Sequence, residues 1–332
     1  MTIIAGLDIG GTKCAVLLGR VDGDEIETIE RIQFLTPDTP EKAIDHMTDT
    51  LDSLIKTHQV SELAAIGISC GGPLDSKRGV VVSPPNLPGW ENIEIVRILE
   101  EQYSIPVALQ NDANAGAMAE WRWGAGKGTE NMIFLTFGTG MGAGLILNGQ
   151  LYSGTNDLAG EVGHIRLAED GPVGFGKAGS FEGFCSGGGI ARIAAKMAEE
   201  AIQQGNPPSY CDNLEQLNGI TAKKVGEAAN AGDPLARKIF SIVGFRLGRA
   251  LSTLVDILNP EKIVIGSIYG RQQELLEPIV LKELKKEAIP LSLSVCEVTT
   301  TGLGEKIGDY ASFSVALLAL EKAQKRKNAG SV

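Results

Sequence analysis

The sequence predicts an α/β protein of two domains. The chain has 332 residues, and one domain commonly takes about 150 residues. Short apolar runs alternate along it with longer segments whose apolar residues recur at helical spacing, which is typical of α/β folds. A strand, a glycine-rich turn and a second strand occur at residues 3–19 and again at residues 132–147. This repetition favours two related domains that face each other, with two unrelated hairpins as the alternative.

The chain begins with a predicted hairpin. The apolar runs Ile3–Ile9 and Ala15–Gly19 flank a turn at residues 10–13, where adjacent glycines interrupt the strand pattern. A helix is predicted over Pro40–His58, because its apolar residues recur at helical spacing and Thr39 directly before it is a start signal. Further strands are predicted at Glu25–Phe34, Ala64–Ser69 and Val107–Gln110, and further helices at Ile93–Tyr103 and Ala113–Trp123.

The rest of the chain repeats the hairpin and then becomes mainly helical. A glycine turn separates the predicted strands Met132–Phe137 and Ala143–Leu147. We expect a small α/β domain at residues 1–112, completed by a C-terminal helix at about residues 310–326, and a large α/β domain at residues 113–309. The remaining predicted elements are helices at Gly189–Gln203, Ala222–Ala231, Pro234–Leu258 and Tyr310–Lys325, and strands at Lys262–Ile265 and Ser294–Thr299.

The composition excludes several classes of protein. Lysine and arginine number 30 against 41 aspartates and glutamates, and the net charge of −11 disfavours a nucleic-acid or anionic-membrane binder. The 42 glycines follow no collagen period, and a hydrophobic content of 43% argues against disorder. The five cysteines lie far apart and the N-terminus has no signal-peptide pattern, so we expect a cytoplasmic protein.

One uncharged stretch, residues 131–156, is long enough to suggest a membrane span. It holds six glycines and an Asn-Gly pair at residues 148–149, and its helix propensity is therefore poor. The stretch predicts a pair of β-hairpins, and we expect no membrane association.

The first motif with chemical potential is the turn that follows Asp8. Gly10 and Gly11 lack Cβ atoms, so backbone N–H groups can approach phosphate oxygens closely. Asp8 at the strand end can hold Mg²⁺ through water, and Thr12 and Lys13 add hydrogen-bond donors. The alternative is a tight hairpin with a capping aspartate.

A second glycine turn contains Gly138, Thr139 and Gly140. By itself it is weak evidence, because an ordinary hairpin has the same pattern. It gains weight from the first turn, since two facing glycine hairpins can hold a polyphosphate from both sides.

Asn111 and Asp112 lie where a predicted strand meets a predicted helix. An aspartate at such a junction is well placed to act as a general base. Aspartate and asparagine also cap helices. The two roles are compatible, with Asp112 catalytic and its neighbour capping.

Glu161 and His164 stand close together in a glycine-containing segment. They could share a metal or a ligand, but the surrounding spacing is not that of a zinc site. Recognition of polar hydroxyl groups is therefore the preferred interpretation. The other histidines, His46 and His58, are expected on the surface of the predicted 40–58 helix.

The order and spacing of these motifs resemble the ROK sugar kinases of the hexokinase/actin-like ATPase superfamily. The resemblance runs nearly end to end through DIGGTK, CGGPLD with PPNLPGW, QNDANA, FGTGMG and LAGEVGH. It implies two ribonuclease H-like domains with a cleft between them. It also implies an ATP-dependent hexose kinase that uses Mg²⁺ and forms a homodimer.

The resemblance implies a role for each matching residue. Asp112 matches the catalytic base that takes a proton from the sugar hydroxyl, and Asp8 with its glycine turn matches the first phosphate motif. Gly138–Gly140 match the second phosphate motif, and Gly266 lies in what looks like the adenosine segment, residues 263–270. Sugar contacts are implied at Gly72, Asn86, Asn111, Glu161, His164 and Glu182.

One segment departs from the family pattern. ROK proteins commonly carry CxCGxxGCxE after the ExGH motif, and its cysteines hold a structural zinc together with the ExGH histidine. Val173, Phe175 and Ser180 stand at the cysteine positions here, while Glu182 is kept. Valine and phenylalanine cannot ligate zinc. We therefore expect no structural zinc, and apolar packing of Val173 and Phe175 in its place.

Two other functions compete with the kinase. A sugar-responsive regulator of the same family would need a DNA-binding segment before Asp8, and the acidic charge counts against it. A sugar-binding protein without kinase activity is disfavoured because Asp112 and the glycine turns are intact. The sequence leaves the sugar and the phosphorylated hydroxyl open.

Overall fold

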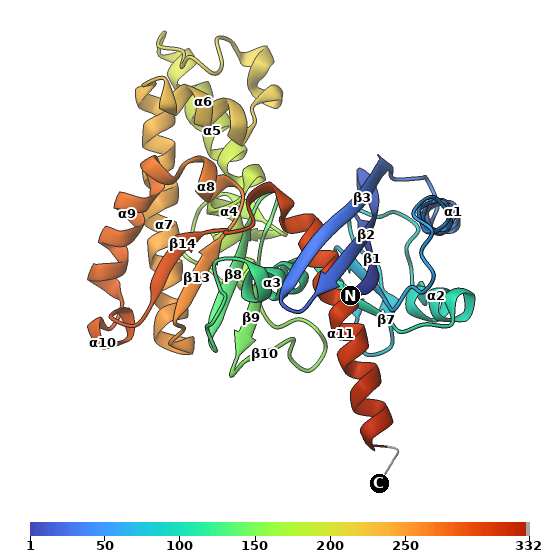
Figure 1. The fold of residues 1–332 in the computed structure, drawn as a ribbon. Coiled ribbons are helices and arrows are strands. Elements are labelled where there is room, and N and C mark those ends of the chain that lie inside the picture. Colours follow the sequence, from blue (N-terminus) through green and yellow to red (C-terminus); the bar gives the residue numbers. More distant parts are fainter. Residues whose placement is uncertain (330–332) are drawn as a thin grey trace. The chain divides into compact units, whose positions relative to one another are not determined.

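The alternation of strands and helices predicted from the sequence is present in the computed structural model, which describes residues 1–329 (Figure 1). Contacts divide the chain into two units. The first unit comprises Met1–Gly128, Gly144–Ala159 and the described residues from Gly302 on, and the second comprises Thr129–Ala143 and Gly160–Thr301. The expected domain boundary at residues 112/113 stays a prediction, and the first contact unit continues beyond it to Gly128.

The first unit is built on a five-stranded sheet in the order β3-β2-β1-β4-β7. β1, β2 and β3 form an antiparallel meander, whereas β1, β4 and β7 run parallel. The parallel strands are almost wholly buried, as expected when helices cover both faces of a sheet. The strands are β1 (Thr2–Ile9), β2 (Lys13–Asp22), β3 (Glu25–Leu35), β4 (Ile66–Cys70) and β7 (Val107–Asn111).

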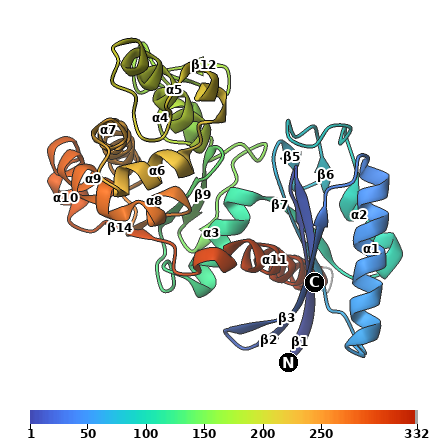
Figure 2. The same cartoon turned by 90° about the horizontal axis from the view of Figure 1, so that it is seen from above.

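Helices cover both faces of this sheet. α1 (Pro40–Thr57) and α2 (Ile95–Tyr103) lie on one face, and α3 (Asp112–Trp123) and α11 (Ile307–Ala329) lie on the other (Figure 2). The predicted start of α1 is confirmed, because the Thr39 side chain accepts a hydrogen bond from the Lys42 N–H.

The packing of α11 on the sheet depends on two glycines. A Cβ atom on Gly67 would lie 2.1 Å from the Ser312 carbonyl oxygen, and one on Gly6 would lie 2.1 Å from the Ser312 Oγ. Only glycine permits so close an approach. The last helix of the chain thus completes the core around the first strands.

The parallel strands of this sheet end together. Ile9 of β1 pairs with Cys70 of β4, and Cys70 pairs with Asn111 of β7. Residues that follow these positions therefore meet at one edge of the sheet. The carboxyl ends of parallel strands are the usual place for ligands in α/β proteins.

A second five-stranded sheet has the order β10-β9-β8-β13-β14. β13 runs parallel to β8 and β14, and β9 pairs antiparallel with β10. The uncharged stretch of residues 131–156 forms strands of this sheet, as predicted. None of the helices in residues 1–329 has the length and apolar character that a membrane crossing requires. The strands are β8 (Met132–Phe137), β9 (Met141–Leu147), β10 (Gln150–Leu151), β13 (Lys262–Ile265) and β14 (Glu297–Thr300).

Long helices form most of the second unit. α7 packs against the others, and its contact with α9 is close because a Cβ atom on Gly248 would lie 2.9 Å from the Val280 carbonyl oxygen. The sequence analysis missed α9, which carries Pro278 inside it. These helices are α5 (Gly187–Gln203), α6 (Ala222–Asn230), α7 (Pro234–Leu258) and α9 (Gln273–Glu287).

Short elements connect the longer ones. Two of them, β11 and β12, pair as a small hairpin that the sequence did not predict. The short strands are β5 (Leu74–Asp75), β6 (Val80–Val81), β11 (Val173–Gly174) and β12 (Lys177–Ala178). The short helices are η1 (Val162–His164), α4 (Phe181–Phe184), η2 (Leu214–Gly219), α8 (Ile268–Arg271), α10 (Pro290–Leu293) and η3 (Gly304–Lys306).

Candidate active site

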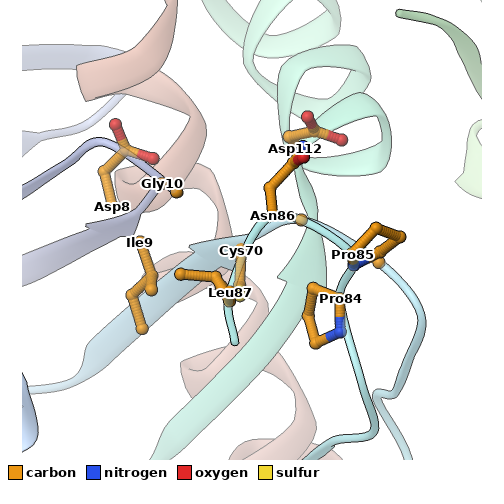
Figure 3. Close-up of a pocket in the computed structure, with 12 residues that line it drawn as sticks. Asp8, Ile9, Gly10, Cys70, Pro84, Pro85, Asn86, Leu87 and Asp112 are labelled. Atoms are coloured by element: carbon orange, nitrogen blue, oxygen red, sulfur yellow. The ribbon is translucent and has the colours of Figure 1, made fainter. Parts of the chain in front are cut away.

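A pocket opens at the edge of the first sheet where β1, β4 and β7 end (Figure 3). Carboxylates, glycine backbone and an amide side chain meet in it, while proline, leucine and isoleucine side chains form its apolar walls. The predicted site residues that line it are Asp8, Gly10, Gly11, Gly72, Asn86 and Asp112.

The first glycine turn forms one wall of this pocket. The Gly10 N–H donates to the Lys13 carbonyl oxygen at 3.1 Å, which closes the turn between β1 and β2. A Cβ atom on Gly11 would lie 2.4 Å from the Asn86 carbonyl oxygen, so only glycine lets the Asn86 loop approach. Thr12 and Lys13 are exposed beside the turn. Backbone N–H groups and side-chain donors thus gather at one place.

Asn111 and Asp112 start α3 at the opposite wall. The Asn111 Oδ1 accepts the Asn114 N–H at 2.7 Å, and the Asp112 Oδ1 accepts the Ala113 N–H at 2.8 Å. Asn111 is therefore the capping residue, as the sequence suggested. Asp112 faces the pocket from the first turn of the helix (Figure 3).

A buried amide pair lies behind these two residues. The Asn114 Nδ2 donates to the Gln110 Oε1 at 3.1 Å, and both side chains are almost fully buried. The pair joins the end of β7 to the first turn of α3. Sequence reasoning gave these two residues no role, although they flank the predicted base within QNDANA.

Both carboxylates of the pocket have a raised pKa. Burial and the nearby Asp112 charge raise the pKa of Asp8 to about 6, while Arg31 opposes the shift. Burial also raises the pKa of Asp112, whose hydrogen bond from the Ala113 N–H acts in the opposite direction. Two hard oxygen ligands that repel each other in an open pocket fit Mg²⁺, which commonly uses one or two carboxylates together with substrate phosphates.

The second unit brings together another group of predicted residues. The Glu182 Oε2 accepts the Met141 N–H at 3.1 Å, directly after the second glycine turn. A Cβ atom on Gly140 would lie 2.9 Å from the same oxygen, and one on Gly163 would lie 2.2 Å from the Met141 carbonyl oxygen. The glycine turn, Glu182 and the segment Glu161–His164 therefore pack as one assembly.

The predicted adenosine segment lies beside the same turn. The Gly266 N–H donates to the Leu135 carbonyl oxygen at 3.0 Å, and a Cβ atom on Gly138 would lie 3.8 Å from the Ser267 Oγ. Ser267 has a φ of 54°, which is unusual for a residue other than glycine. Sequence reasoning gave Ser267 no role, because no sequence motif predicts a positive φ at a serine.

The start of α5 also reaches the second glycine turn, and the sequence analysis assigned it no function. The Gly187 N–H donates to the Gly138 carbonyl oxygen at 2.7 Å, and the Ser186 Oγ accepts the Gly189 N–H at 2.9 Å. The run Ser186–Gly189 is a serine cap followed by glycines, so a helix start with accessible backbone was readable from the sequence.

The segment that replaces the cysteine motif differs from its prediction. Val173 is 47% exposed and Phe175 is 73% exposed, so the expected apolar packing of these two side chains is wrong. Gly174 is buried against Gly183 of α4, so its neighbour Val173 points to the opposite, solvent side of β11, and Phe175 lies in the turn. In residues 1–329, no group of three or more histidine, cysteine, aspartate or glutamate side chains could hold a metal ion.

Comparisons with known proteins agree with the motifs. A model of the ROK family matches residues 4–316. The glucokinase of Halalkalibacterium halodurans is 32% identical over 307 residues, which cover 91% of each chain. The crystal structure of a ROK family glucokinase from Streptomyces griseus, in complex with glucose and AMPPNP, has a TM-score of 0.74 and 30% identity and covers 96% of this chain and 99% of that one.

A regulator is also similar to this chain. The xylose repressor of Caldicellulosiruptor bescii is 29% identical over 267 residues, which cover 80% of this chain and 65% of the repressor. The match leaves about a third of the repressor unaligned, whereas the glucokinase match covers nearly all of both proteins.

Proposed function

This chain belongs to the ROK family, and from that premise we propose that it transfers the γ-phosphoryl group of ATP to a hexose hydroxyl, with Asp112 as the general base. The chain is an ATP-dependent sugar kinase, like the glucokinases that it resembles over nearly its whole length. The observation that carries the assignment of the base is the Asp112 carboxylate, which faces the same pocket as Asp8 and the first glycine turn.

Asp112 is suited to accept a proton. Its burial raises its pKa above the usual value for aspartate, and a base with a higher pKa takes a proton from a hydroxyl more readily. In the transfer, the hydroxyl proton passes to the Asp112 carboxylate while the sugar oxygen bonds to the γ-phosphorus and the bond to the β-phosphate oxygen breaks. Positioning and charge neutralisation supply most of the catalysis in such reactions.

Asp8 and the first glycine turn would serve the phosphates. Asp8 would hold Mg²⁺ through water, and the bound ion would neutralise charge on the phosphate oxygens. The Gly11 N–H group, with Thr12 and Lys13, would donate hydrogen bonds to phosphate oxygens, and Gly10, whose own N–H closes the turn, would let the phosphates approach because it has no Cβ atom. A net charge of −11 makes this local supply of donors necessary.

The second unit would contribute the remaining contacts. Gly138, Thr139 and Gly140 would contact phosphate, and Gly266 would contact the adenosine. For the sugar we propose contacts from Glu161, His164 and Glu182, together with Gly72, Asn86 and Asn111. We also propose that the chain forms two ribonuclease H-like domains, divided at residues 112/113, with a cleft between them. We propose that the protein is cytoplasmic and forms a homodimer. Light scattering after size-exclusion chromatography tests the homodimer.

The Asp112→Asn variant tests the general base. It keeps the cap geometry and the size of the side chain but cannot accept the proton, so kcat should fall by about 10²- to 10⁴-fold. A coupled ADP-release assay measures kcat, and calorimetry should find sugar binding within about threefold of wild type. Asp38→Asn, which changes an exposed carboxylate, is the matched control and should leave kcat unchanged. Near-normal turnover of Asp112→Asn would show that the base lies elsewhere.

Glucose is the first sugar to test, because the similar glucokinase structure binds it. A panel with fructose, mannose and N-acyl hexosamines, each with and without nucleotide in a thermal-shift screen, identifies the preferred sugar. The regulator is the second candidate, favoured by the xylose repressor match. Sequence-specific DNA binding in a gel-shift assay, without turnover of any sugar, would select it.

A further inference from the structure

The hairpin of β11 and β12 lies directly against His164. The Lys177 Nζ donates to the His164 carbonyl oxygen at 2.8 Å. The Phe175 ring, at the hairpin tip, meets the His164 ring edge to face, with the centroids 6.3 Å apart and an interplanar angle of 81°. Two side chains of one short hairpin thus contact both the backbone and the side chain of the same histidine.

The base of the hairpin is fixed to the segment that follows His164. The Leu167 N–H donates to the Gly179 carbonyl oxygen at 2.8 Å, and the Phe181 N–H donates to the Ile165 carbonyl oxygen at 2.8 Å. Gly179 has a φ of 67°, and a Cβ atom there would lie 2.0 Å from the Ala168 carbonyl oxygen. These backbone hydrogen bonds hold the two segments side by side, and the Arg166 side chain adds a hydrogen bond to the Ala178 carbonyl oxygen at 2.9 Å.

The donor set of this loop does not fit zinc. The Val173 and Phe175 side chains have no ligating atom. Ser180 is fully buried, and its Oγ is already engaged, because it donates to the Gly174 carbonyl oxygen at 3.3 Å and accepts the Gly183 N–H at 3.0 Å. The hydroxyl that stands at a cysteine position therefore stabilises the hairpin directly.

Phe175 is the first residue of the two-residue turn between β11 and β12, and such a turn requires a positive φ at both of its residues. The φ of Phe175 is 44°, in the left-handed region where bulky side chains are strained and glycine or asparagine is preferred. Its ring is also 73% exposed, so burial in a core does not compensate for the strain. The contact that distinguishes this ring is the one with His164.

We propose that the β11–β12 hairpin is a metal-independent support for His164, in which Phe175 orients the imidazole ring and Lys177 holds the backbone carbonyl. Phe175 and Lys177 are thus positioning residues for sugar recognition. This inference rests on the proposed role of His164 as a sugar contact. The experiments below separate the support of His164 from the kinase activity itself.

Steady-state kinetics of hairpin variants test the effect on the sugar. Phe175→Leu removes the aromatic ring but keeps an apolar side chain, and the KM for the sugar should rise about two- to tenfold. The KM for ATP and kcat should stay within about twofold of wild type, because the proposed role of the ring is confined to His164. Phe175→Tyr should restore the sugar KM.

A matched control separates a local effect from damage to the hairpin. Val173→Thr changes the other exposed apolar residue of the hairpin, and its sugar KM should equal that of wild type. Lys177→Met should raise the sugar KM as Phe175→Leu does. An unchanged sugar KM in Phe175→Leu, or an equal rise in the KM values for sugar and ATP, would overturn the positioning role.

Nuclear magnetic resonance of the histidines tests the support without any activity. The chain has three histidines, and His164→Gln assigns the His164 ring signals. In Phe175→Leu the His164 ring signals should shift, because the ring current of the neighbouring aromatic is lost. Those of His46 and His58 should not move. If the His164 signals do not move, the ring contact is absent and the proposal is wrong.

Metal analysis completes the test. The purified protein should contain far less than one zinc per chain, and chelation followed by added Mg²⁺ should leave the sugar KM unchanged. The metal-independent support would be wrong if the protein held one zinc per chain and the His164 signals shifted when that zinc was removed by a chelator. If wild type phosphorylates no sugar, the kinase assignment is wrong. The histidine spectra still test the contact between Phe175 and His164, because they do not depend on activity.

Discussion

The two strand–glycine turn–strand hairpins share a sequence pattern but treat their neighbouring carboxylates differently. Beside the first turn, burial and the nearby Asp112 charge raise the pKa of Asp8 to about 6. Beside the second turn, the Glu182 carboxylate accepts the Met141 N–H and stabilises the turn. The surroundings of Asp8 therefore disfavour its charged form, whereas the Glu182 carboxylate accepts a hydrogen bond from the backbone.

The glycines differ in the same way. Gly11 of the first turn is pressed against the Asn86 backbone, and Gly140 of the second turn is pressed against the end of the Glu182 side chain. Backbone cannot move aside as a flexible side chain can. The first turn is thus rigid and lies beside a destabilised charge, whereas the second turn is shaped by side-chain hydrogen bonding.

We expect the greatest loss of activity when the carboxylate beside the first turn is removed. Asp8→Asn removes the carboxylate proposed to serve Mg²⁺, and kcat should fall by about 10²-fold or more, because the loss acts where charge develops in the transition state. A titration of kcat against Mg²⁺ should also show a weaker metal dependence than in wild type.

Asp22→Asn, at the end of the neighbouring strand β2, is the control and should behave as wild type. If turnover and Mg²⁺ dependence are unchanged in Asp8→Asn, Asp8 does not serve Mg²⁺. The proposed contrast between Asp8 and Glu182 would then be wrong.

A pair of glycine variants compares the two turns directly. Gly11→Ala must displace the Asn86 backbone, and kcat/KM should fall by roughly 10- to 100-fold, since small misplacements in an active site are costly. Gly140→Ala need only displace the Glu182 carboxylate, and the fall should be several times smaller. Gly219→Ala, whose added Cβ would meet only the Lys224 Nζ at 3.8 Å, is the control. If kcat/KM falls further in Gly140→Ala than in Gly11→Ala, the second turn is the more rigid one and the comparison is wrong.

The smallest effect concerns stability and its dependence on pH. Asp8 has a pKa of about 6 in the fold against a usual 3.8, so its contribution to stability is complete below pH 3.8 and is lost as the pH rises through about 6. Asp8→Asn should therefore be more stable than wild type by roughly 1 to 3 kcal/mol near neutral pH. Urea unfolding without Mg²⁺ at about pH 5 and pH 7.5 measures this difference, which should shrink at the lower pH. If the difference in stability does not change with pH, the pKa of Asp8 is not raised in the folded protein.

The elements that the sequence predicted well carry a strong local signal. Apolar runs locate β1, β4 and β8, and Thr39 with its following proline starts α1 where expected. The motif spacing also predicted residues that gather in one pocket, because Asp8, Asn86 and Asp112 all line it.

The features that escaped prediction depend on contacts between distant segments. The sequence does not reveal that the Asn86 backbone covers Gly11, or that Ser267 adopts a positive φ beside Gly138. The side chains of Val173 and Phe175 were expected to pack inward, but Gly174 occupies the buried side of β11 and Phe175 lies in the turn of the hairpin. An apolar residue in a hairpin predicts burial only when something else is present to cover it.

The contact of Gly6 and Gly67 with Ser312 has a consequence for biosynthesis. The sheet of the first unit is made early in translation, but α11, which packs on one of its faces, follows every strand that residues 1–329 form. The second unit, which ends at Thr301, is therefore complete on the ribosome before the first unit can close its core. During this interval α3 covers only part of that face, so the nascent chain carries a partly uncovered apolar surface, which is the kind of surface that chaperones bind.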